Sequence, residues 1–282
     1  MILEKTVKEA SQILKKNNID SYELDAQIIL SDIMGVTREF LILNSDKNIS
    51  DNLINKYNNA IKRRIKREPT AYITGKKEFW SEDFIINSST LIPRPETELL
   101  IYKIIDFFKG KKINILDIGT GSGCILLSIL KELKYSRGIG IDISKNAIQT
   151  AKLNSKNLNL INRSKFKVFD LNNFFIGKYD LIVSNAPYIP SNDIKNLSEE
   201  IINYEPKNAL DGGVDGLDLI KKVIYKSKYL LKSNGVLGLE IGFGQYQKVS
   251  SVLKKCGLRE KSKVYDYKRN VRCIISTKAR YI

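Results

Sequence analysis

The feature that most constrains how this chain can fold is an alternation of short apolar runs with helix-length segments in its second half. Four runs have the length and β-branched content of buried strands: "KINILDIG", "RGIGIDIS", "KFKVFD" and "YDLIVSN". Helix-length segments separate them, residues 146–158 among them. This alternation favours a mainly parallel sheet with helices on both faces.

Two further stretches extend the predicted sheet. "GVLGLEIG", residues 235–242, predicts one more strand, and "KVYDYKRNVRCIIST", residues 263–277, predicts a closing pair. With the four earlier runs, they predict an α/β fold built on a doubly wound, mainly parallel, seven-stranded sheet. We assign residues 91–282 to this domain.

The first 74 residues show a different pattern, because their apolar residues recur at helical spacing. Two stripes are formed by Leu3, Val7, Ala10 and Leu14, and by Leu24, Ile28, Ile29 and Ile33. Gly35 is expected to end the second helix, and Ser50 to cap a later one that stops before Pro69. We therefore predict a small all-helical domain over residues 1–74. Residues 75–90 alternate aromatic and polar side chains and predict a β-hairpin linker between the domains.

Composition limits the chemistry that the chain can perform. Its 282 residues contain no histidine, which excludes Ser–His and Cys–His nucleophilic mechanisms and the usual zinc sites. The cysteines, Cys124, Cys256 and Cys273, lie far apart and suggest neither a disulfide framework nor a metal site. No apolar run reaches membrane-spanning length, and the N-terminal residues do not resemble a secretory signal. We expect a cytoplasmic protein without a bound metal.

The chain is strongly basic. It carries 47 Lys and Arg against 31 Asp and Glu, a formal net charge of +16. Such a charge favours polyanionic partners such as RNA, but a composition biased towards lysine explains the same excess. The helical segment is nearly neutral, so most of the positive charge lies beyond it. Direct nucleic-acid binding therefore stays open as one of two interpretations.

A glycine-rich turn follows the first predicted strand of the sheet. Its residues are Gly119, Thr120, Gly121, Ser122 and Gly123, and an apolar helix begins directly after them. Glycines here allow left-handed backbone angles and let a ligand approach the backbone at the helix N-terminus. A dinucleotide site requires the spacing Gly-x-Gly-x-x-Gly or Ala, whereas position 124 is cysteine. The spacing therefore weakens a nicotinamide or flavin assignment.

Polar residues end the next three strands. Asp142 follows the first glycine by about 20 residues, a position from which a carboxylate can accept both hydrogen bonds of a ribose diol. Asp170 and Leu171 end the third strand, where one polar contact and an apolar wall could hold an adenine. Asn185 ends the fourth strand. Because ligands bind at the carboxyl ends of strands in open α/β sheets, these residues predict one shared site.

The stretch "SNAPYIP" after the fourth strand is the most specific signal. Its prolines lack an N–H and stop the strand, which leaves Asn185 at the sheet edge, followed by Ala186, Pro187 and Tyr188. With the glycine loop, this arrangement resembles the class I S-adenosylmethionine-dependent methyltransferases. In that class, which has a Rossmann-like fold, the Asn-Pro-Pro-Tyr type of motif marks enzymes that methylate a planar nitrogen.

Further stretches resemble the HemK/PrmC family of protein-(glutamine-N5) methyltransferases. They are "EPTAYITGKKEFW", "LIPRPETE", "EPKNALDGGVDGLD" and "LEIGFGQ", and the resemblance covers nearly the whole chain. It implies an enzyme that transfers a methyl group from S-adenosylmethionine to a side-chain amide nitrogen. The acceptor implied is the glutamine of the Gly-Gly-Gln motif in class I peptide-chain release factors, whose methylation tunes translation termination. The helical segment would then dock this protein substrate.

The resemblance also assigns roles to residues. Those expected to bind the cofactor are Gly119, Thr120, Gly121, Ser122, Gly123, Asp142, Asp170, Leu171 and Asn185. Those expected to bind the substrate and to act in catalysis are Asn185, Ala186, Pro187 and Tyr188. Two departures stand out: Ala186 replaces a proline of the family, and Phe79, Trp80 and Ser81 replace its Phe-Tyr-Gly hairpin. Alanine supplies the same backbone carbonyl without the φ restraint, so rigidity and not chemistry is expected to change.

Alternatives stay open at this point. The same motif would serve a nucleic-acid amino-methyltransferase acting on adenine or guanine, and a scaffold protein could retain the cofactor without turnover. The small, nearly neutral helical domain suits docking of a protein better than contacts with phosphates. Glu240 is either a buried structural acid or a group that faces the site, and Glu96 either contacts the motif or stabilises a helix N-terminus. We expect a monomer.

Overall fold

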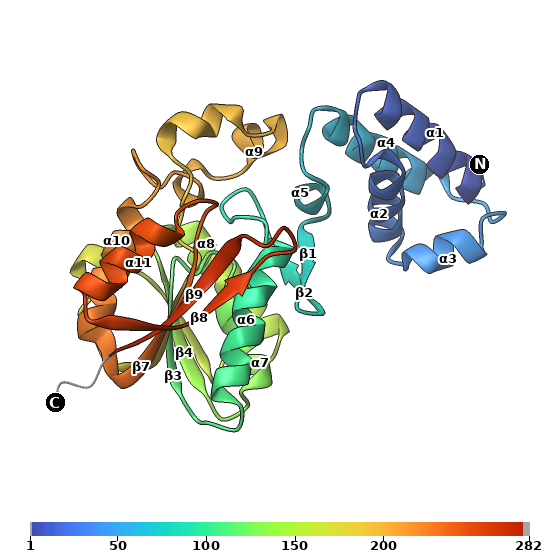
Figure 1. The fold of residues 1–282 in the computed structure, drawn as a ribbon. Helices are drawn as coiled ribbons and strands as arrows, with labels where there is room; N and C mark the ends of the chain where they lie inside the picture. Colours follow the sequence, from blue (N-terminus) through green and yellow to red (C-terminus); the bar gives the residue numbers. More distant parts are fainter. Residues whose placement is uncertain (1, 279–282) are drawn as a thin grey trace. The chain divides into compact units, whose positions relative to one another are not determined.

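The computed structural model describes residues 2–278 and divides into two compact units (Figure 1). The helical unit comprises the chain up to Lys76 together with Ser198–Tyr204, and the sheet unit comprises Lys77–Leu197 and the chain from Glu205 onward. Residue 1 of the predicted helical domain and residues 279–282 of the predicted second domain lie outside the described residues. Within residues 2–278, no helix is long and apolar enough to cross a membrane.

The helical unit consists of helices from the N-terminal segment and one short helix from later in the chain. They are α1 (Leu3–Lys16), α2 (Tyr22–Met34), α3 (Arg38–Leu43), α4 (Asp51–Ile65), α5 (Thr70–Thr74) and α9 (Glu199–Tyr204). Helices α1, α2 and α4 pack against one another (blue in Figure 1). Their apolar stripes form one core, in which Leu14, Leu30 and Tyr57 are fully buried.

Two details of the helical unit differ from the sequence prediction. Leu24 is 43% exposed, because the buried face of α2 runs through Ala26, Ile29 and Leu30 instead. Ser50 does occupy the N-cap position of α4, but its side chain makes no capping hydrogen bond. Gly35 ends α2 in the left-handed conformation, as predicted.

The basic cluster at the end of α4 contains one buried cation. Arg64 is 3% exposed, and its guanidinium bonds Oδ2 of Asp25 at 2.7 Å and Oε1 of Glu200 at 2.6 Å. Tyr204 adds a hydrogen bond from its hydroxyl to the carbonyl of Lys66 at 2.6 Å. These bonds connect α9 to α4 and explain why a segment so late in the sequence belongs to the helical unit.

The sheet unit is built on seven strands in the order β5-β4-β3-β6-β7-β9-β8. The strands are β3 (Asn114–Ile118), β4 (Arg137–Asp142), β5 (Ser164–Val168), β6 (Tyr179–Ser184), β7 (Leu231–Glu240), β8 (Leu258–Tyr265) and β9 (Val271–Lys278). The first five strands of this order are mutually parallel, and β9 runs antiparallel to both β7 and β8. The predicted doubly wound, mainly parallel, seven-stranded sheet is confirmed.

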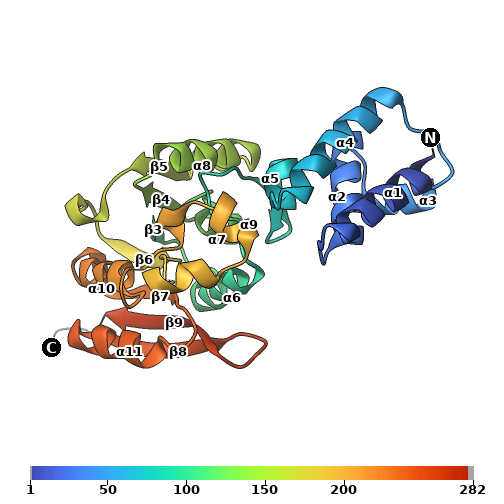
Figure 2. The same cartoon turned by 90° about the horizontal axis from the view of Figure 1, so that it is seen from above.

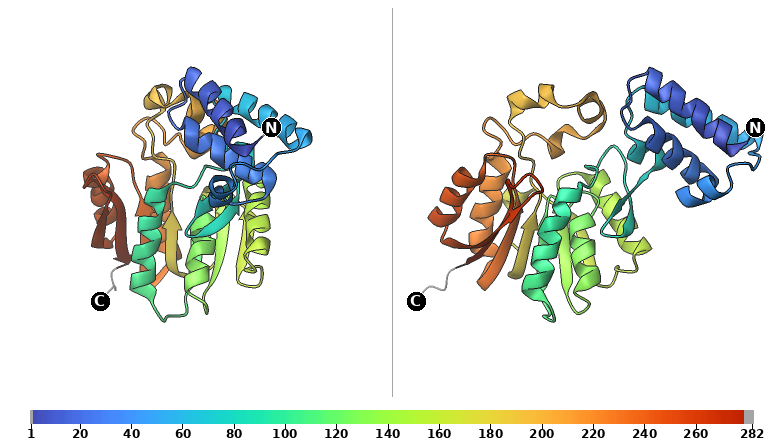
Figure 3. Two further views of the ribbon diagram at one scale, coloured as in Figure 1. Left: turned by 90° about the vertical axis from the view of Figure 1, so that its right-hand side faces the viewer. Right: turned by 45° about the vertical axis from the view of Figure 1, so that its right-hand side comes forward.

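Helices cover both faces of this sheet (Figures 2 and 3). The helices are α6 (Pro95–Phe108), α7 (Cys124–Glu132), α8 (Lys145–Asn157), α10 (Asp218–Leu230) and α11 (Tyr246–Lys255), with short 3-10 turns at Leu171–Asn173, Ser191–Asn196 and Lys207–Ala209. One apolar core contains Leu181 of β6 with residues of α6, α7 and α8, and the other contains Ile182 with residues of α10 and α11. Consecutive residues of β6 thus face opposite layers, as the pleat of a strand requires.

A β-hairpin precedes the sheet, formed by β1 (Lys76–Phe79) and β2 (Glu82–Ile85). Its two turn residues, Trp80 and Ser81, have φ of 53° and 57°, as a two-residue hairpin turn with primed geometry requires. The side chain of Asn154 on α8 accepts from the N–H of Ile85 at 2.7 Å and donates to its carbonyl at 2.9 Å. This pair of hydrogen bonds anchors β2 to the sheet unit.

Neighbouring strands β3 and β6 bring two loops together at the carboxyl edge of the sheet. Asp117 of β3 pairs with Val183 of β6, and the hydroxyl of Ser184 donates to the carbonyl of Ile118 at 2.8 Å. The chain therefore leaves the sheet at the same level after both strands. Because the order of strands reverses between β3 and β6, this is the place where open α/β sheets bind ligands.

Candidate functional site

The loop after β3 exposes its backbone. The N–H groups of Gly119 and Thr120 donate to the carbonyl of Ile141 at 2.9 and 3.0 Å, which ties the loop to β4. Gly119 and Gly121 have left-handed φ of 72° and 54°, and a Cβ added at either would meet no atom within 4 Å. Both glycines therefore border open space, where a ligand can approach the main chain.

Asp142 ends β4 beside this loop. Its Oδ2 accepts from the N–H of Gly121 at 3.0 Å and its Oδ1 from the N–H of Ser144 at 2.9 Å. A carboxylate offers about four acceptor positions, so one on each oxygen remains for a diol. Burial raises the pKa of Asp142, and the two backbone N–H groups oppose that shift. Ile143 next to it is 61% exposed and offers an apolar surface.

Asp117 lies beneath the glycine loop and is fully buried. The hydroxyl of Thr120 donates to its Oδ2 at 2.6 Å, whereas Oδ1 has no hydrogen-bond partner among the described residues. Burial raises the pKa of Asp117 to about 7, and the charge of Asp142 adds to that shift. A buried carboxylate oxygen without a donor suits a ligand that carries positive charge. Asp117 is not among the site residues predicted from the sequence, although it is the acidic residue just before the loop.

Asp170 and Leu171 occupy different environments after β5. Asp170 is exposed, and its carboxylate accepts from the N–H of Asn172 at 2.8 Å, which lowers its pKa. Leu171 is 6% exposed and packs in the core that also contains Ile141 and Ala186. The two residues thus present a polar group and little apolar surface at this strand end.

The side-chain amide of Asn185 follows β6 and has defined partners. Its Nδ2 donates to Oγ1 of Thr97 on α6 at 3.3 Å, and that hydroxyl donates to Oε2 of Glu240 on β7 at 2.6 Å. No residue in the described part of the chain donates to Oδ1 of Asn185, so this oxygen can accept from a ligand. Ala186, in place of the proline, is 1% exposed and is restrained by packing in the core.

Tyr188 is held by charged groups. Nη2 of Arg272 on β9 donates to its hydroxyl at 2.5 Å, and the guanidinium carbon lies 4.9 Å from the ring centroid. The same Nη2 is 3.1 Å from Oε1 of Glu240, which is fully buried. Burial, followed by the charge of Glu240, raises the pKa of Tyr188 to about 12. The phenol therefore stays protonated, and its ring has a fixed place beside Asn185.

Gln245 fastens the backbone of the motif. Its Nε2 donates to the carbonyls of Tyr188 at 2.8 Å and Gly216 at 3.2 Å, and its Oε1 accepts from the N–H of Gly242 at 2.8 Å. A Cβ at Gly216 would lie 2.3 Å from the Tyr188 carbonyl, so only glycine fits there. Three loops are thereby joined around the motif.

The structure brings together most of the residues that the sequence singled out, at the ends of β3, β4 and β6. The supporting side chains of Thr97, Arg272 and Gln245 were missed, because they are distant in sequence from the motif. A signal for two of them existed, since Thr97 lies in "LIPRPETE" and Gln245 in "LEIGFGQ". Glu240 is fully buried and contacts Thr97 and Arg272, so its interpretation as a buried structural acid applies.

The open glycine loop, the carboxylate of Asp142 and the unpartnered oxygen of Asp117 fit a ligand with a diol and positive charge. S-adenosylmethionine has both, in its ribose and in its ammonium and sulfonium groups. The residues present therefore suit this cofactor.

Two family models match the chain. Residues 5–75 match the PrmC N-terminal domain, and residues 109–257 match a methyltransferase domain. The first match lies in the helical unit. The second lies in the sheet unit except for Ser198–Tyr204, which belong to the helical unit.

Curated relatives match almost the whole chain. The release factor glutamine methyltransferase of Caulobacter vibrioides is 35% identical over 280 residues, which cover 99% of this chain and 97% of that protein. The release factor glutamine methyltransferase of Rhodospirillum rubrum is also 35% identical, over 98% of this chain and 85% of that protein. Among solved structures, the hMettl16 catalytic domain in complex with MAT2A 3′UTR hairpin 6 has a TM-score of 0.60 at 16% identity. The match covers 83% of this chain and 84% of the hMettl16 chain, and the similarity concerns the fold alone.

Proposed function

This chain belongs to the release factor glutamine methyltransferase family, and we propose that it methylates the side-chain nitrogen of the Gly-Gly-Gln glutamine in class I peptide-chain release factors. The observation that carries this proposal is the Asn185–Tyr188 motif, which ends β6 beside the open glycine loop. The protein is a protein-(glutamine-N5) methyltransferase that uses S-adenosylmethionine. The alternative of base methylation is not favoured, because the relatives are named for the release factor reaction.

The cofactor, when bound, supplies an electrophilic methyl group. We assign its binding to the loop Gly119–Gly123, to Asp142 and to the strand end at Asp170 and Leu171, with Asn185 closing the site towards the substrate. Asp142 is suited to a ribose diol through the free acceptor positions of its carboxylate. Asp117 joins these residues, since its carboxyl oxygen beneath the loop lacks a hydrogen-bond donor among the described residues and a nearby cationic group would favour its ionised form.

The motif is suited to an amide acceptor. A glutamine nitrogen is a weak nucleophile because its lone pair is delocalised into the carbonyl. If Oδ1 of Asn185 and the carbonyl of Ala186 each accept one of its N–H groups, the nitrogen is oriented and its developing positive charge is stabilised by fixed dipoles. Pro187 stiffens the loop, and the ring of Tyr188 packs against the planar amide. The nitrogen then loses a proton to solvent, so the chemistry needs no histidine, and the sequence contains none.

The domain roles follow from this assignment. The helical domain, predicted over residues 1–74, docks the release factor; residues 75–90 form the hairpin linker, and residues 91–282 carry the transfer reaction. We also place the enzyme in the cytoplasm as a monomer, because its substrate acts on the ribosome and one chain carries the whole site.

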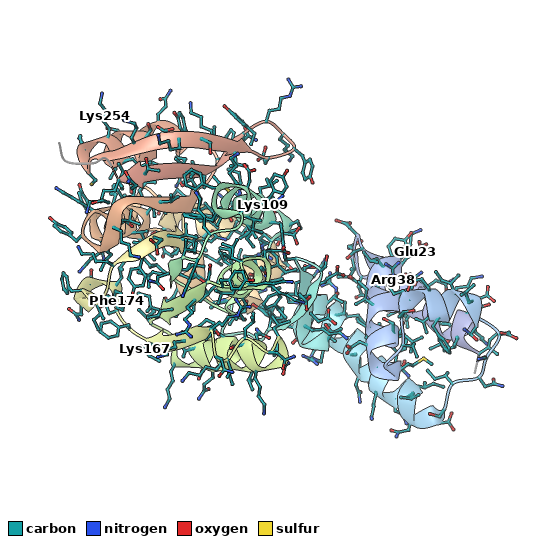
Figure 4. The ribbon with its side chains drawn as sticks, turned by 90° about the horizontal axis from the view of Figure 1, so that it is seen from below. Glu23, Arg38, Lys109, Lys167, Phe174 and Lys254 are labelled. Carbon is teal, nitrogen blue, oxygen red and sulfur yellow. The ribbon has the colours of Figure 1, made fainter. Side chains whose placement is uncertain are left out.

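Positively charged side chains are present at both edges of the sheet unit. Exposed lysines lie at opposite edges of the sheet unit, Lys167 on the edge strand β5 and Lys254 on α11 beside the other edge strand, β8 (Figure 4). A nucleic-acid groove instead requires positive charge along one continuous path.

The proposal is tested by methyl transfer from labelled S-adenosylmethionine. The acceptors are a purified class I release factor, the same factor with its Gly-Gly-Gln glutamine replaced by alanine, and total RNA and DNA. We expect label on the wild-type factor alone. Label on nucleic acid would move the function to base methylation, and label on the alanine variant would show that another residue is the acceptor.

A further inference from the structure

We propose that Glu240, acting through Thr97, determines which end of the Asn185 side-chain amide faces the substrate. This inference rests on the proposed function, because it concerns the oxygen that is to accept the glutamine N–H. Thr97 and Glu240 are positioning residues, because they act on the reaction through the side chains of the motif that they hold in place.

The direction of the hydrogen bonds carries the argument. An ionised carboxylate has no proton to donate, so the Thr97 hydroxyl must donate to Oε2 of Glu240, 2.6 Å away. A hydroxyl has a single proton. Its oxygen can therefore only accept from Asn185, which is 3.3 Å away and must turn its Nδ2 towards Thr97. The amide oxygen of Asn185 is thereby left for the substrate.

The direction of these hydrogen bonds requires that Glu240 is ionised. Arg272 favours this ionised form. Glu240 is fully buried, and Nη2 of Arg272 lies 3.1 Å from its Oε1. Burial raises the pKa of Glu240, whereas the guanidinium and the Thr97 hydroxyl stabilise its charge; Glu96 is the other charged group that acts on it. A neutral carboxyl could donate to Thr97 and would free the hydroxyl proton to face Asn185.

The same carboxylate also orders the other end of the motif. Arg272, held by Oε1 of Glu240, donates to the hydroxyl of Tyr188 at 2.5 Å. One buried acid on β7 therefore positions both Asn185 and Tyr188, although it lies more than 50 residues later in the sequence.

The test compares Thr97→Val with Thr97→Ser in the full chain. Valine keeps the shape of the side chain but removes the hydroxyl, so the Asn185 amide loses the acceptor that orients its Nδ2. We expect kcat to fall about 10- to 100-fold, a typical effect of losing an orienting partner, with KM for the release factor and Kd for S-adenosylmethionine within about twofold of wild type. Serine restores the hydroxyl and is expected to return kcat to within about threefold.

A second readout does not depend on turnover. Exchange of the Asn185 side-chain amide protons can be followed by NMR in ¹⁵N-labelled protein, using the pair of resonances that is missing in Asn185→Ala. We expect slow exchange in wild type and in Thr97→Ser, and faster exchange in Thr97→Val.

The outcomes separate this inference from the proposed function. Wild-type kcat in Thr97→Val would overturn the inference, and so would a parallel loss of cofactor binding, which a merely structural link between α6 and β7 predicts. If the wild-type enzyme does not methylate the release factor, the proposed function fails, and the exchange measurement still decides whether Thr97 orients Asn185.

Discussion

The two halves of the site are built in different ways. The loop after β3 is shaped by its backbone: glycines at left-handed φ leave open space, and its hydrogen bonds run from main-chain N–H groups to Ile141 and Asp142. The motif after β6 is shaped by side chains, since Thr97, Glu240 and Arg272 reach it from three other elements.

The two halves are therefore sensitive to different substitutions. A backbone-built loop depends on a few consecutive residues, and changes there affect how tightly a ligand binds. A side-chain network depends on distant partners, and changes there affect how accurately the reacting groups are oriented. We therefore expect substitutions at the cofactor side to change the Kd for S-adenosylmethionine and substitutions in the motif to change kcat.

The largest effect is expected for Asn185→Ala. It removes the side-chain oxygen proposed to accept the glutamine N–H, and loss of one preorganised polar group in an active site costs about 10²–10³ in kcat. The Kd for S-adenosylmethionine should change by no more than about twofold, because the glycine loop is untouched. Steady-state kinetics and calorimetry measure both quantities; unchanged turnover would refute the role of Asn185.

Asp142→Asn should show the opposite pattern. The amide keeps the size of the carboxylate but replaces one acceptor oxygen with a donor and removes the charge, so the Kd for S-adenosylmethionine is expected to rise about 10- to 100-fold. At saturating cofactor, kcat should remain near the wild-type value. The control is Asp106→Asn on α6, where the exposed carboxylate forms an ion pair with Lys103 three residues earlier. A selective loss of kcat with unchanged Kd would show that Asp142 acts in turnover and not in cofactor binding.

Asp117 predicts a pH-dependent stability of the cofactor-free protein. Burial raises its pKa from 3.8 to about 7, so between these pH values the folded state retains a proton that the unfolded chain has released. The free energy of unfolding therefore falls as pH rises through this window, with a slope of at most about 1.4 kcal/mol per pH unit. The destabilisation is absent below about pH 4 and complete above about pH 7.

The variant Asp117→Asn tests this assignment. It should flatten the fall in Tm between pH 5 and pH 7, about the window set by the two pKa values, and should weaken binding of the cationic cofactor. A variant with the same pH profile as wild type would show that another group is responsible.

The smallest effect is expected for Ser81→Gly in the hairpin turn. Ser81 adopts a φ of 57° without being glycine, whereas the loop after β3 uses glycine at such angles. Relief of this conformation should stabilise the protein by about 0.5–1 kcal/mol, with methyl transfer unchanged. Chemical denaturation measures the gain, and a destabilised variant would show that Ser81 makes a contact that outweighs its strain.

The sequence predicted the loop after β3 better than the side chains that support the motif after β6. The glycine loop, Asp142 and Asn185 were identified because consecutive residues and strand ends encode them. The parallel strands were predicted for a similar reason, since buried parallel strands read as apolar runs. The antiparallel closing pair was predicted over residues 263–277, whereas β8 begins at Leu258, because its alternating burial gives a weaker signal. Thr97, Arg272 and Gln245 were not identified, because their roles depend on contacts between elements that only the folded chain brings together.

Burial gives two residues roles that their local sequence does not indicate. Arg64, in the basic cluster at the end of α4, is a buried partner of Asp25 and Glu200. Ala186, expected to loosen the motif, is held by core packing. In both cases tertiary contacts outweigh the preference of the isolated residue.

The most direct test of the central claim is to locate the methyl group. Release factor incubated with the enzyme and S-adenosylmethionine would be digested and its peptides sequenced by mass spectrometry, with Asn185→Ala as the matched control. We expect one added methyl group on the side chain of the Gly-Gly-Gln glutamine with the wild-type enzyme and almost none with the variant. A methyl group on any other residue, or equal modification by both enzymes, would contradict this expectation.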